Sequence, residues 1–130
     1  MQSLPHRRRV LALVGAAAAA ALPVAALAHH GWSWTDDDFF ELKGVVSAVY
    51  VGNPHATLDV DSDGETWRVE MAPPSRTIAA GVTEESVKAG DAVTAIGHRS
   101  QDHAEKRMKA VRIIVGDKTY DVYPGLVPPA

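Results

Sequence analysis

The chain has 130 residues, a formal net charge of −3 and no cysteine. This length predicts a single domain with one modest core. The lack of cysteine excludes a disulfide framework, a thiolate metal site and a cysteine nucleophile. The acidic balance argues against a nucleic-acid or anionic-membrane partner, because each needs a basic surface.

The first 28 residues have the pattern of a secretory signal peptide. Arg7, Arg8 and Arg9 precede an Ala-, Leu- and Val-rich stretch, and Ala26-Leu27-Ala28 is a typical cleavage site. Pro23 and the small-residue ending favour cleavage over a membrane-spanning helix. We therefore expect a periplasmic or secreted protein without stable membrane insertion; the paired arginines leave both the general and the twin-arginine export route open. Cleavage would leave a more acidic chain, since the leader holds three of the 13 basic residues and none of the 16 acidic ones.

One strand is predicted on each side of a corner at Gly52-Asn53-Pro54-His55. Leu42–Val51 is rich in β-branched and aromatic residues, and Gly44 within it suggests a bulge or a bend. Residues Ala56–Val60 alternate between apolar and polar side chains. Because Pro54 has no N–H and a fixed φ, the hydrogen-bond ladder must break there. The corner is therefore expected to hold His55 at the start of a strand.

Further short strands are predicted along the rest of the chain. Ser62-Asp63-Gly64 is a hairpin turn, and Trp67, Val69 and Met71 alternate along the returning strand. A short helix follows, which we expect to be capped by Ser75 and ended by Gly81. The remaining predicted segments are strands at Ala92–His98, Met108–Val115 and Lys118–Tyr123, and a disordered Pro-rich tail at Pro124–Ala130.

This order predicts an all-β fold with one short helix, a small OB-like barrel of five to six strands. A small β-sandwich is the alternative. The expected organisation is a signal peptide at 1–28, an N-terminal segment of the mature protein at 29–41, the barrel at 42–123 and the tail at 124–130.

In its sequence features the chain resembles a secreted bacterial family catalogued as domain of unknown function (DUF) 6152. The matching features are Ala28-His29-His30, Leu42-Lys43-Gly44-Val45-Val46, Asn53-Pro54-His55, Trp67-Arg68-Val69-Glu70 and Ser86-Val87-Lys88-Ala89-Gly90-Asp91. Family members often have a proline where this chain has Ala89. The resemblance implies the barrel and export, and it brings no established activity.

Copper is the metal that the histidines favour. Cleavage after Ala28 would leave His29 with a free α-amine, and this amine and the His29 imidazole can chelate one ion together. His55 or His98 would supply a further imidazole, and cleavage one residue earlier would bring His30 into an amino-terminal site. Nitrogen ligands of these kinds suit Cu(II). The alternatives are that the terminal histidines are only polar and that His55 only hydrogen-bonds neighbouring backbone.

Two further readings stay open beside a periplasmic, non-enzymatic copper-binding protein. The first is an OB-type module that binds a small molecule, a glycan or a protein partner without metal. The second is calcium binding at the acidic 59–70 hairpin, because Asp59 through Glu70 fits a calcium-loop pattern. Strands rather than helices are predicted on both sides of that loop, which argues against calcium. No enzyme signature is present, so no catalytic residue is expected.

Overall fold

The computed structural model describes residues 30–130, so the predicted signal peptide and His29 lie outside the described residues. The described chain is mostly strand with one short α-helix. Its elements are, in order, η1 (His30–Trp32), β1 (Phe40–Tyr50), β2 (Thr57–Ser62), β3 (Glu65–Glu70), α2 (Pro74–Ala79), β4 (Ala92–Arg99), β5 (Arg107–Val115), β6 (Lys118–Asp121) and η2 (Pro124–Leu126).

The strands form a closed barrel of the OB type with one additional strand. β1 pairs antiparallel with both β2 and β4, and β3 closes the barrel by pairing parallel with β5. The closing register places Glu70 beside Lys109. α2 lies between β3 and β4 in the chain, as in the OB pattern, and β6 extends the sheet beyond β5. The predicted fold class is confirmed.

The core fills the barrel with small and medium apolar side chains. Alternation along β2 and β3 turns Leu58, Val60, Trp67 and Val69 inward. The inward residues of the other strands and loops join them in one cluster, so a single core holds the domain together. At about 25 cal/mol per Å² of buried apolar surface, this cluster is the main stabilising contribution.

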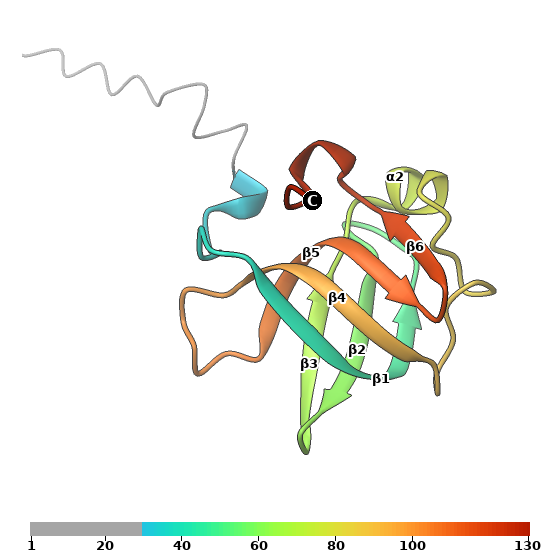
Figure 1. The fold of residues 1–130 in the computed structure, drawn as a ribbon, viewed down its shortest axis with the longest axis horizontal. Coiled ribbons are helices and arrows are strands. Elements are labelled where there is room, and N and C mark those ends of the chain that lie inside the picture. The colour runs from blue at the N-terminus through green and yellow to red at the C-terminus, as the bar shows by residue number, and fades with distance from the viewer. Residues whose placement is uncertain (1–29) are drawn as a thin grey trace, which may run out of the picture.

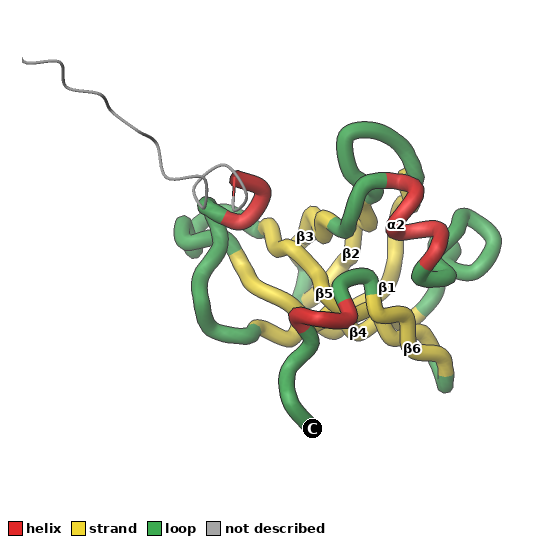
Figure 2. Tube along the Cα trace, turned by 90° about the horizontal axis from the view of Figure 1, so that it is seen from above, coloured by secondary structure: helices red, strands yellow, loops and turns green. Residues whose placement is uncertain are grey.

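The short helices gather at one end of the barrel. η1, α2 and η2 surround this end in two perpendicular views, whereas the β2–β3 hairpin points the other way (Figures 1 and 2). A bridge between Thr35 and Ser100 fastens the segment after η1 to the loop between β4 and β5. Residues from distant parts of the chain therefore meet at this end.

Several local predictions need correction. The bulge in β1 lies at Ser47 rather than Gly44, since the register skips one residue between Val46 and Ala48. Gly44 instead lies where a Cβ would come within 2.3 Å of the Asp61 carbonyl oxygen. The helix begins two residues earlier than a Ser75 cap predicts, because Pro74 with its fixed φ starts it and Pro73 is the N-cap. Gly81 ends the helix with φ 103°, as predicted.

The C-terminal segment is also more ordered than predicted. Residues 124–126 form η2, and Leu126 contributes to the wall of two pockets. The backbone N–H groups of Val122 and Tyr123 both donate to Val111, which secures the chain just before η2. Val111 is the extra residue of a bulge in β5, so its carbonyl is free to accept both.

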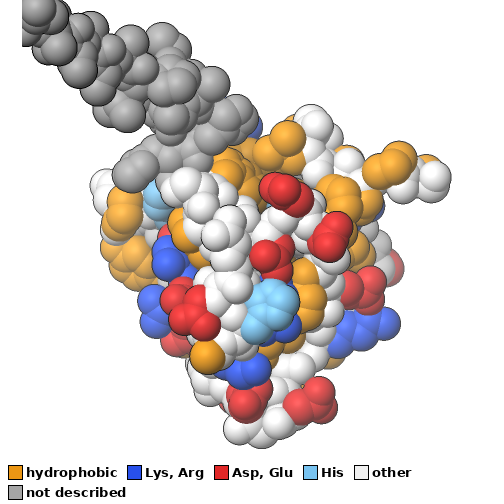
Figure 3. All heavy atoms as spheres, turned by 90° about the vertical axis from the view of Figure 1, so that its left-hand side faces the viewer, with side chains coloured by type: hydrophobic (Ala, Val, Ile, Leu, Met, Phe, Trp, Pro, Cys, Tyr) orange, Lys and Arg blue, Asp and Glu red, His pale blue; other side chains and the backbone are white. Residues whose placement is uncertain are grey.

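The surface carries charges of both signs. Basic and acidic side chains are interspersed over the face drawn in Figure 3, which shows no basic band. Among residues 30–130, no helix is long and apolar enough to cross a membrane.

Candidate functional site

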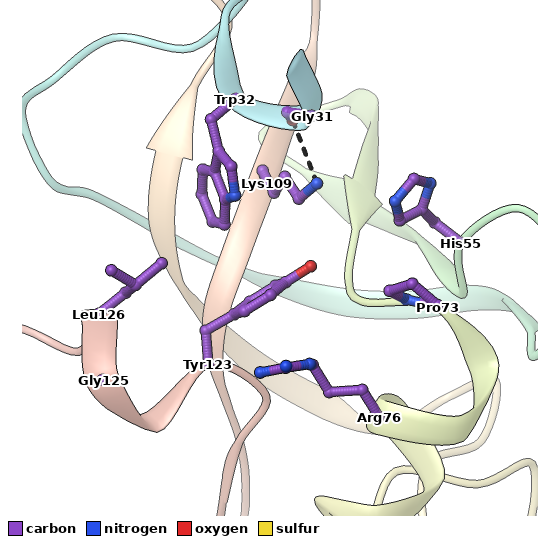
Figure 4. A pocket seen from close by; sticks show the side chains of 9 residues that line it. All are labelled: Gly31, Trp32, His55, Pro73, Arg76, Lys109, Tyr123, Gly125 and Leu126. Atoms are coloured by element: carbon purple, nitrogen blue, oxygen red, sulfur yellow. Dashed lines mark hydrogen bonds between the residues drawn. The ribbon is translucent and has the colours of Figure 1, made fainter. Parts of the chain in front are cut away.

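The end of the barrel that the short helices surround contains a cavity of about 440 Å³, which we call the rim pocket. Its lining comes from η1, the Asn-Pro-His corner, α2, β5 and η2 (Figure 4). The lining residues are Gly31, Trp32, His55, Pro73, Arg76, Lys109, Tyr123, Gly125 and Leu126. A concave space with aromatic walls and a few polar groups has the character of a small-ligand site.

Lys109 is the most unusual residue of this pocket, because its charged side chain is only 2% exposed. Its Nζ donates to the Gly31 carbonyl oxygen at 3.1 Å and lies 4.8 Å from the centre of the Trp32 ring. Burial lowers the pKa of Lys109, and the Arg107 charge lowers it further, while Glu70 partly opposes both. One protein acceptor leaves two ammonium protons for another partner.

His55 faces the same pocket from the Asn-Pro-His corner. Burial lowers its pKa, the positive charge of Lys109 lowers it further, and Glu70 acts in the opposite direction. The imidazole is therefore neutral at pH 7, with one nitrogen as donor and one as acceptor. The described part of the chain offers its ring no hydrogen-bond partner, so the expectation that His55 merely bonds neighbouring backbone finds no support in these residues.

Tyr123 and Arg76 complete the polar lining. Burial raises the pKa of the Tyr123 hydroxyl, which therefore stays protonated and can donate. Within residues 30–130 this hydroxyl has no hydrogen-bond partner. The Arg76 guanidinium lies 5.3 Å from the centre of the Tyr123 ring. In Figure 4 the Lys109 ammonium, the Tyr123 hydroxyl and the His55 ring point toward one space, and Arg76 lies across the Tyr123 ring from them.

The Glu70 carboxylate, whose charge acts on both Lys109 and His55, is already paired. Arg107 donates from Nε to Glu70 at 2.8 Å, and its guanidinium lies 3.8 Å from the centre of the Trp34 ring. Glu70 therefore softens the positive charge of the rim pocket without neutralising Lys109 or Arg76. His55 also lines a second depression of about 470 Å³, together with Glu70 and Arg107 among others.

The predicted metal ligands are divided between two places. His55 lines the rim pocket together with Gly31, the residue that follows His30 in the chain. His98 lines a different cavity of about 670 Å³, with Trp32 and Phe39, and its Nδ1 lies 3.0 Å from the Asp38 carbonyl oxygen. Within residues 30–130 no group of three or more His, Asp or Glu side chains is arranged to hold a metal ion.

The acidic hairpin has partners of its own. The Asp59 carboxylate pairs with Arg68 at 2.6 Å, and Asp61 accepts a hydrogen bond from the Thr66 hydroxyl at 2.7 Å. Strands β2 and β3 flank the turn, as the sequence predicts. Calcium binding at this hairpin stays a prediction.

Comparison with known proteins places the chain in a family. A family model described as "Family of unknown function (DUF6152)" matches residues 17–109. The chain belongs to this family. No curated protein matches this DUF6152 protein.

Among solved structures, 71 chains match the DUF6152 protein. One is a chain of the S. pombe Stn1–Ten1 complex, with a TM-score of 0.50 and 17% sequence identity. The alignment covers 62% of this chain and 59% of the other, so this chain spans less than two thirds of that relative. At this identity the likeness is one of fold.

Sequence reasoning missed three lining residues with polar side chains, namely Arg76, Lys109 and Tyr123. A lysine inside the apolar run Met108–Val115 is the one signal that could have pointed to the pocket. On a barrel strand an outward lysine normally reaches solvent, and here η1 covers it. The covering segment could not be inferred from strand alternation.

Proposed function

We propose that this DUF6152 protein is an exported, non-enzymatic binding module whose small-molecule ligand occupies the rim pocket. The observation that carries the proposal is the convergence of two aromatic walls and three polar side chains on one cavity of about 440 Å³. That volume suits a small molecule, since ligand pockets span roughly 300–1,000 Å³. OB barrels bind many ligands at their rims and loops, so the fold is compatible with this role and does not select the ligand.

A matched series of small ring compounds tests the proposal. Benzoate, benzyl alcohol and benzylammonium have the same ring and differ in charge. We expect at least one to shift the NMR signals of the Trp32 indole N–H and of the Gly31 and Gly125 amides, which lie at the pocket. The amides of Gly64 and Gly116, at the two hairpin turns, are internal controls. If neither these compounds nor phosphate nor Cu(II) shifts the pocket signals, the proposal is wrong.

Copper is the second candidate ligand, because Gly31 and His55 line the same pocket. In this alternative, the α-amine and imidazole of a processed His29 would approach His55. If cleavage falls one residue earlier, His30 would be a ligand as well. His98, in its separate cavity, is the weaker candidate for the additional imidazole. The positive charges of Lys109 and Arg76 oppose a bound cation, whereas a neutral imidazole at His55 favours it.

Copper binding is tested by titrating Cu(II) into three samples with calorimetry and EPR. The samples are protein beginning at His29, the same protein with one added N-terminal residue, and the His55→Ala variant. We expect one-to-one binding that weakens in both altered samples. Equal, weak binding in all three would reject copper. If Cu(II) binding is lost only in the protein with the added N-terminal residue, the N-terminus binds copper and His55 is not a ligand.

A further inference from the structure

We infer that the rim pocket is an oxyanion site that takes a carboxylate or phosphate group between Lys109, Tyr123 and His55. This inference rests on the proposed function and specifies the chemistry of its ligand. The donors point toward one space from three separate segments: β5, the residue before η2, and the Asn-Pro-His corner (Figure 4). Among residues 30–130, no negatively charged side chain lines the pocket.

The hydrogen-bonding capacity of the pocket is the first argument. Lys109 Nζ donates one of its three protons to the Gly31 carbonyl, so two remain for a ligand. The Tyr123 hydroxyl is a donor without a partner among residues 30–130, and the His55 ring has an N–H to donate. Donors therefore outnumber acceptors around the cavity. An oxyanion, which only accepts hydrogen bonds, is the complementary group.

The placement of charge is the second argument. A lysine that is 2% exposed carries a desolvation cost, and the Trp32 and Tyr123 rings, whose centres are 4.8 Å and 5.8 Å from Nζ, only partly replace water. The Glu70 carboxylate, which lies beside Lys109 across the β3–β5 pairing, is held by Arg107. A bound anion would give the ammonium a negatively charged partner besides the Gly31 carbonyl, and Arg76 would add favourable charge across the Tyr123 ring.

The walls define the rest of the ligand. Trp32, Pro73 and Leu126 present apolar surface beside the donors, and Leu126 is 49% exposed. The site therefore suits a small acid with an apolar or ring-shaped body. Inorganic phosphate, which has no such body, should bind more weakly than an aromatic carboxylate.

Charge preference is tested with the same ring compounds, titrated by NMR into wild type and three variants. We expect benzoate to bind, and benzyl alcohol and benzylammonium to bind at least tenfold more weakly, since a charge-assisted hydrogen bond contributes roughly a factor of ten or more. Tyr123→Phe removes only the hydroxyl and should weaken benzoate about tenfold. Lys109→Met keeps the length of the side chain and should weaken it at least as much. Tyr120→Phe is the matched control on β6, outside the pocket, and should bind like wild type.

The outcomes separate this inference from the function it deepens. If benzyl alcohol or benzylammonium shifts the pocket signals as strongly as benzoate, the pocket binds small molecules and the oxyanion assignment is wrong. The assignment is also wrong if benzoate binds Tyr123→Phe and Lys109→Met as it binds wild type. If phosphate binds and benzoate does not, the oxyanion stands and the apolar body is rejected.

Discussion

Lys109 on β5 donates a hydrogen bond to the carbonyl of Gly31, 78 positions earlier, so one buried ammonium joins the barrel to the segment that covers its end. The same ammonium lies over the Trp32 ring. Lys109 is thus at once a structural link to η1 and the main charge of the rim pocket. Its two roles lead to opposite expectations for stability and for binding.

Lys109→Met is expected to fold and to be at least as stable as wild type without ligand. Methionine has a similar length and removes the cost of a buried charge, and such replacements are often neutral or stabilising. Urea unfolding of the two proteins measures this difference. A loss of several kcal/mol would mean that the hydrogen bond to Gly31 outweighs the cost of burying the charge.

The same variant separates the two candidate ligands. Removing a positive charge from the rim pocket should weaken benzoate and strengthen Cu(II), because the charge attracts the first and repels the second. Parallel titrations of wild type and Lys109→Met give both affinities. Lys43→Gln is the control, because it removes one positive charge from an exposed position on β1 that does not line the pocket. If both ligands respond in the same direction, the pocket charge does not govern binding.

His55 predicts a fall in stability on acidification. Burial and Lys109 hold the pKa of His55 below the ordinary 6.5, while Glu70 opposes them. Among the described residues, the other titratable or charged groups that line the two pockets bordered by His55 are Tyr50, Arg68, Arg76, Arg107 and Tyr123. Below pH 6.5 the unfolded chain takes up a proton before the folded one does, so stability present above that pH is lost as pH falls toward the folded pKa. The urea midpoint at pH 5 and pH 8 should therefore differ less in His55→Gln than in wild type.

Bound anion should reverse that preference, because a negative charge beside the imidazole favours its protonated form. Benzoate should then bind more tightly at pH 5.5 than at pH 7.5, with proton uptake detectable as a buffer-dependent heat. In His55→Gln this pH dependence should shrink. An unchanged dependence would assign the proton to another group.

Arg112 and Asp121 form an ion pair whose contribution to stability is lost in acid. The hydrogen bond from Arg112 lowers the pKa of Asp121, and the Arg112 charge adds to this while burial opposes it. The stabilisation is present above the ordinary Asp pKa and is lost as pH falls through the lower folded pKa. Because both side chains are partly exposed, Arg112→Gln should cost at most about 1 kcal/mol at pH 7. Urea unfolding between pH 2 and pH 7 should show the two proteins converging in acid.

Gly97 on β4 is expected to tolerate no side chain. A Cβ there would lie 1.9 Å from the carbonyl oxygen of Lys109, opposite the bulge in β5. Gly97→Ala should lower the free energy of unfolding by about 3 kcal/mol, because backbone rather than a flexible side chain must move. Gly125→Ala, with open space around it, should change stability by less than about 0.5 kcal/mol. Equal effects of the two substitutions would contradict this reading of the β4–β5 contact.

Local sequence patterns predicted the strands well and the covering segments poorly. Alternation around Leu58 and Val69 and the turn at Asp63-Gly64 carried enough information for β2 and β3. The bulges at Ser47 and Val111 depend on how strands from distant parts of the chain curve to close the barrel. The sequence of one strand does not contain this information. The corner was expected to hold His55 at the start of a strand, and it brings this residue to the rim pocket just before β2. Its partners Lys109 and Tyr123 come from long-range closure and could not be assigned to one site from spacing.

The parallel pairing of β3 with β5 has a consequence for local opening of the molecule. Glu70 and Lys109 are paired across these two strands. The main positive charge of the rim pocket therefore lies at the strand pairing that closes the barrel, where the barrel would open. A ligand held by Lys109 and His55 would connect β5 to the Asn-Pro-His corner, which leads into β2, the strand paired with β3. Amide hydrogen exchange at residues 68–70 and 107–109 should then slow when ligand binds, because a bound ligand would stabilise the pairing of β3 with β5 against local opening.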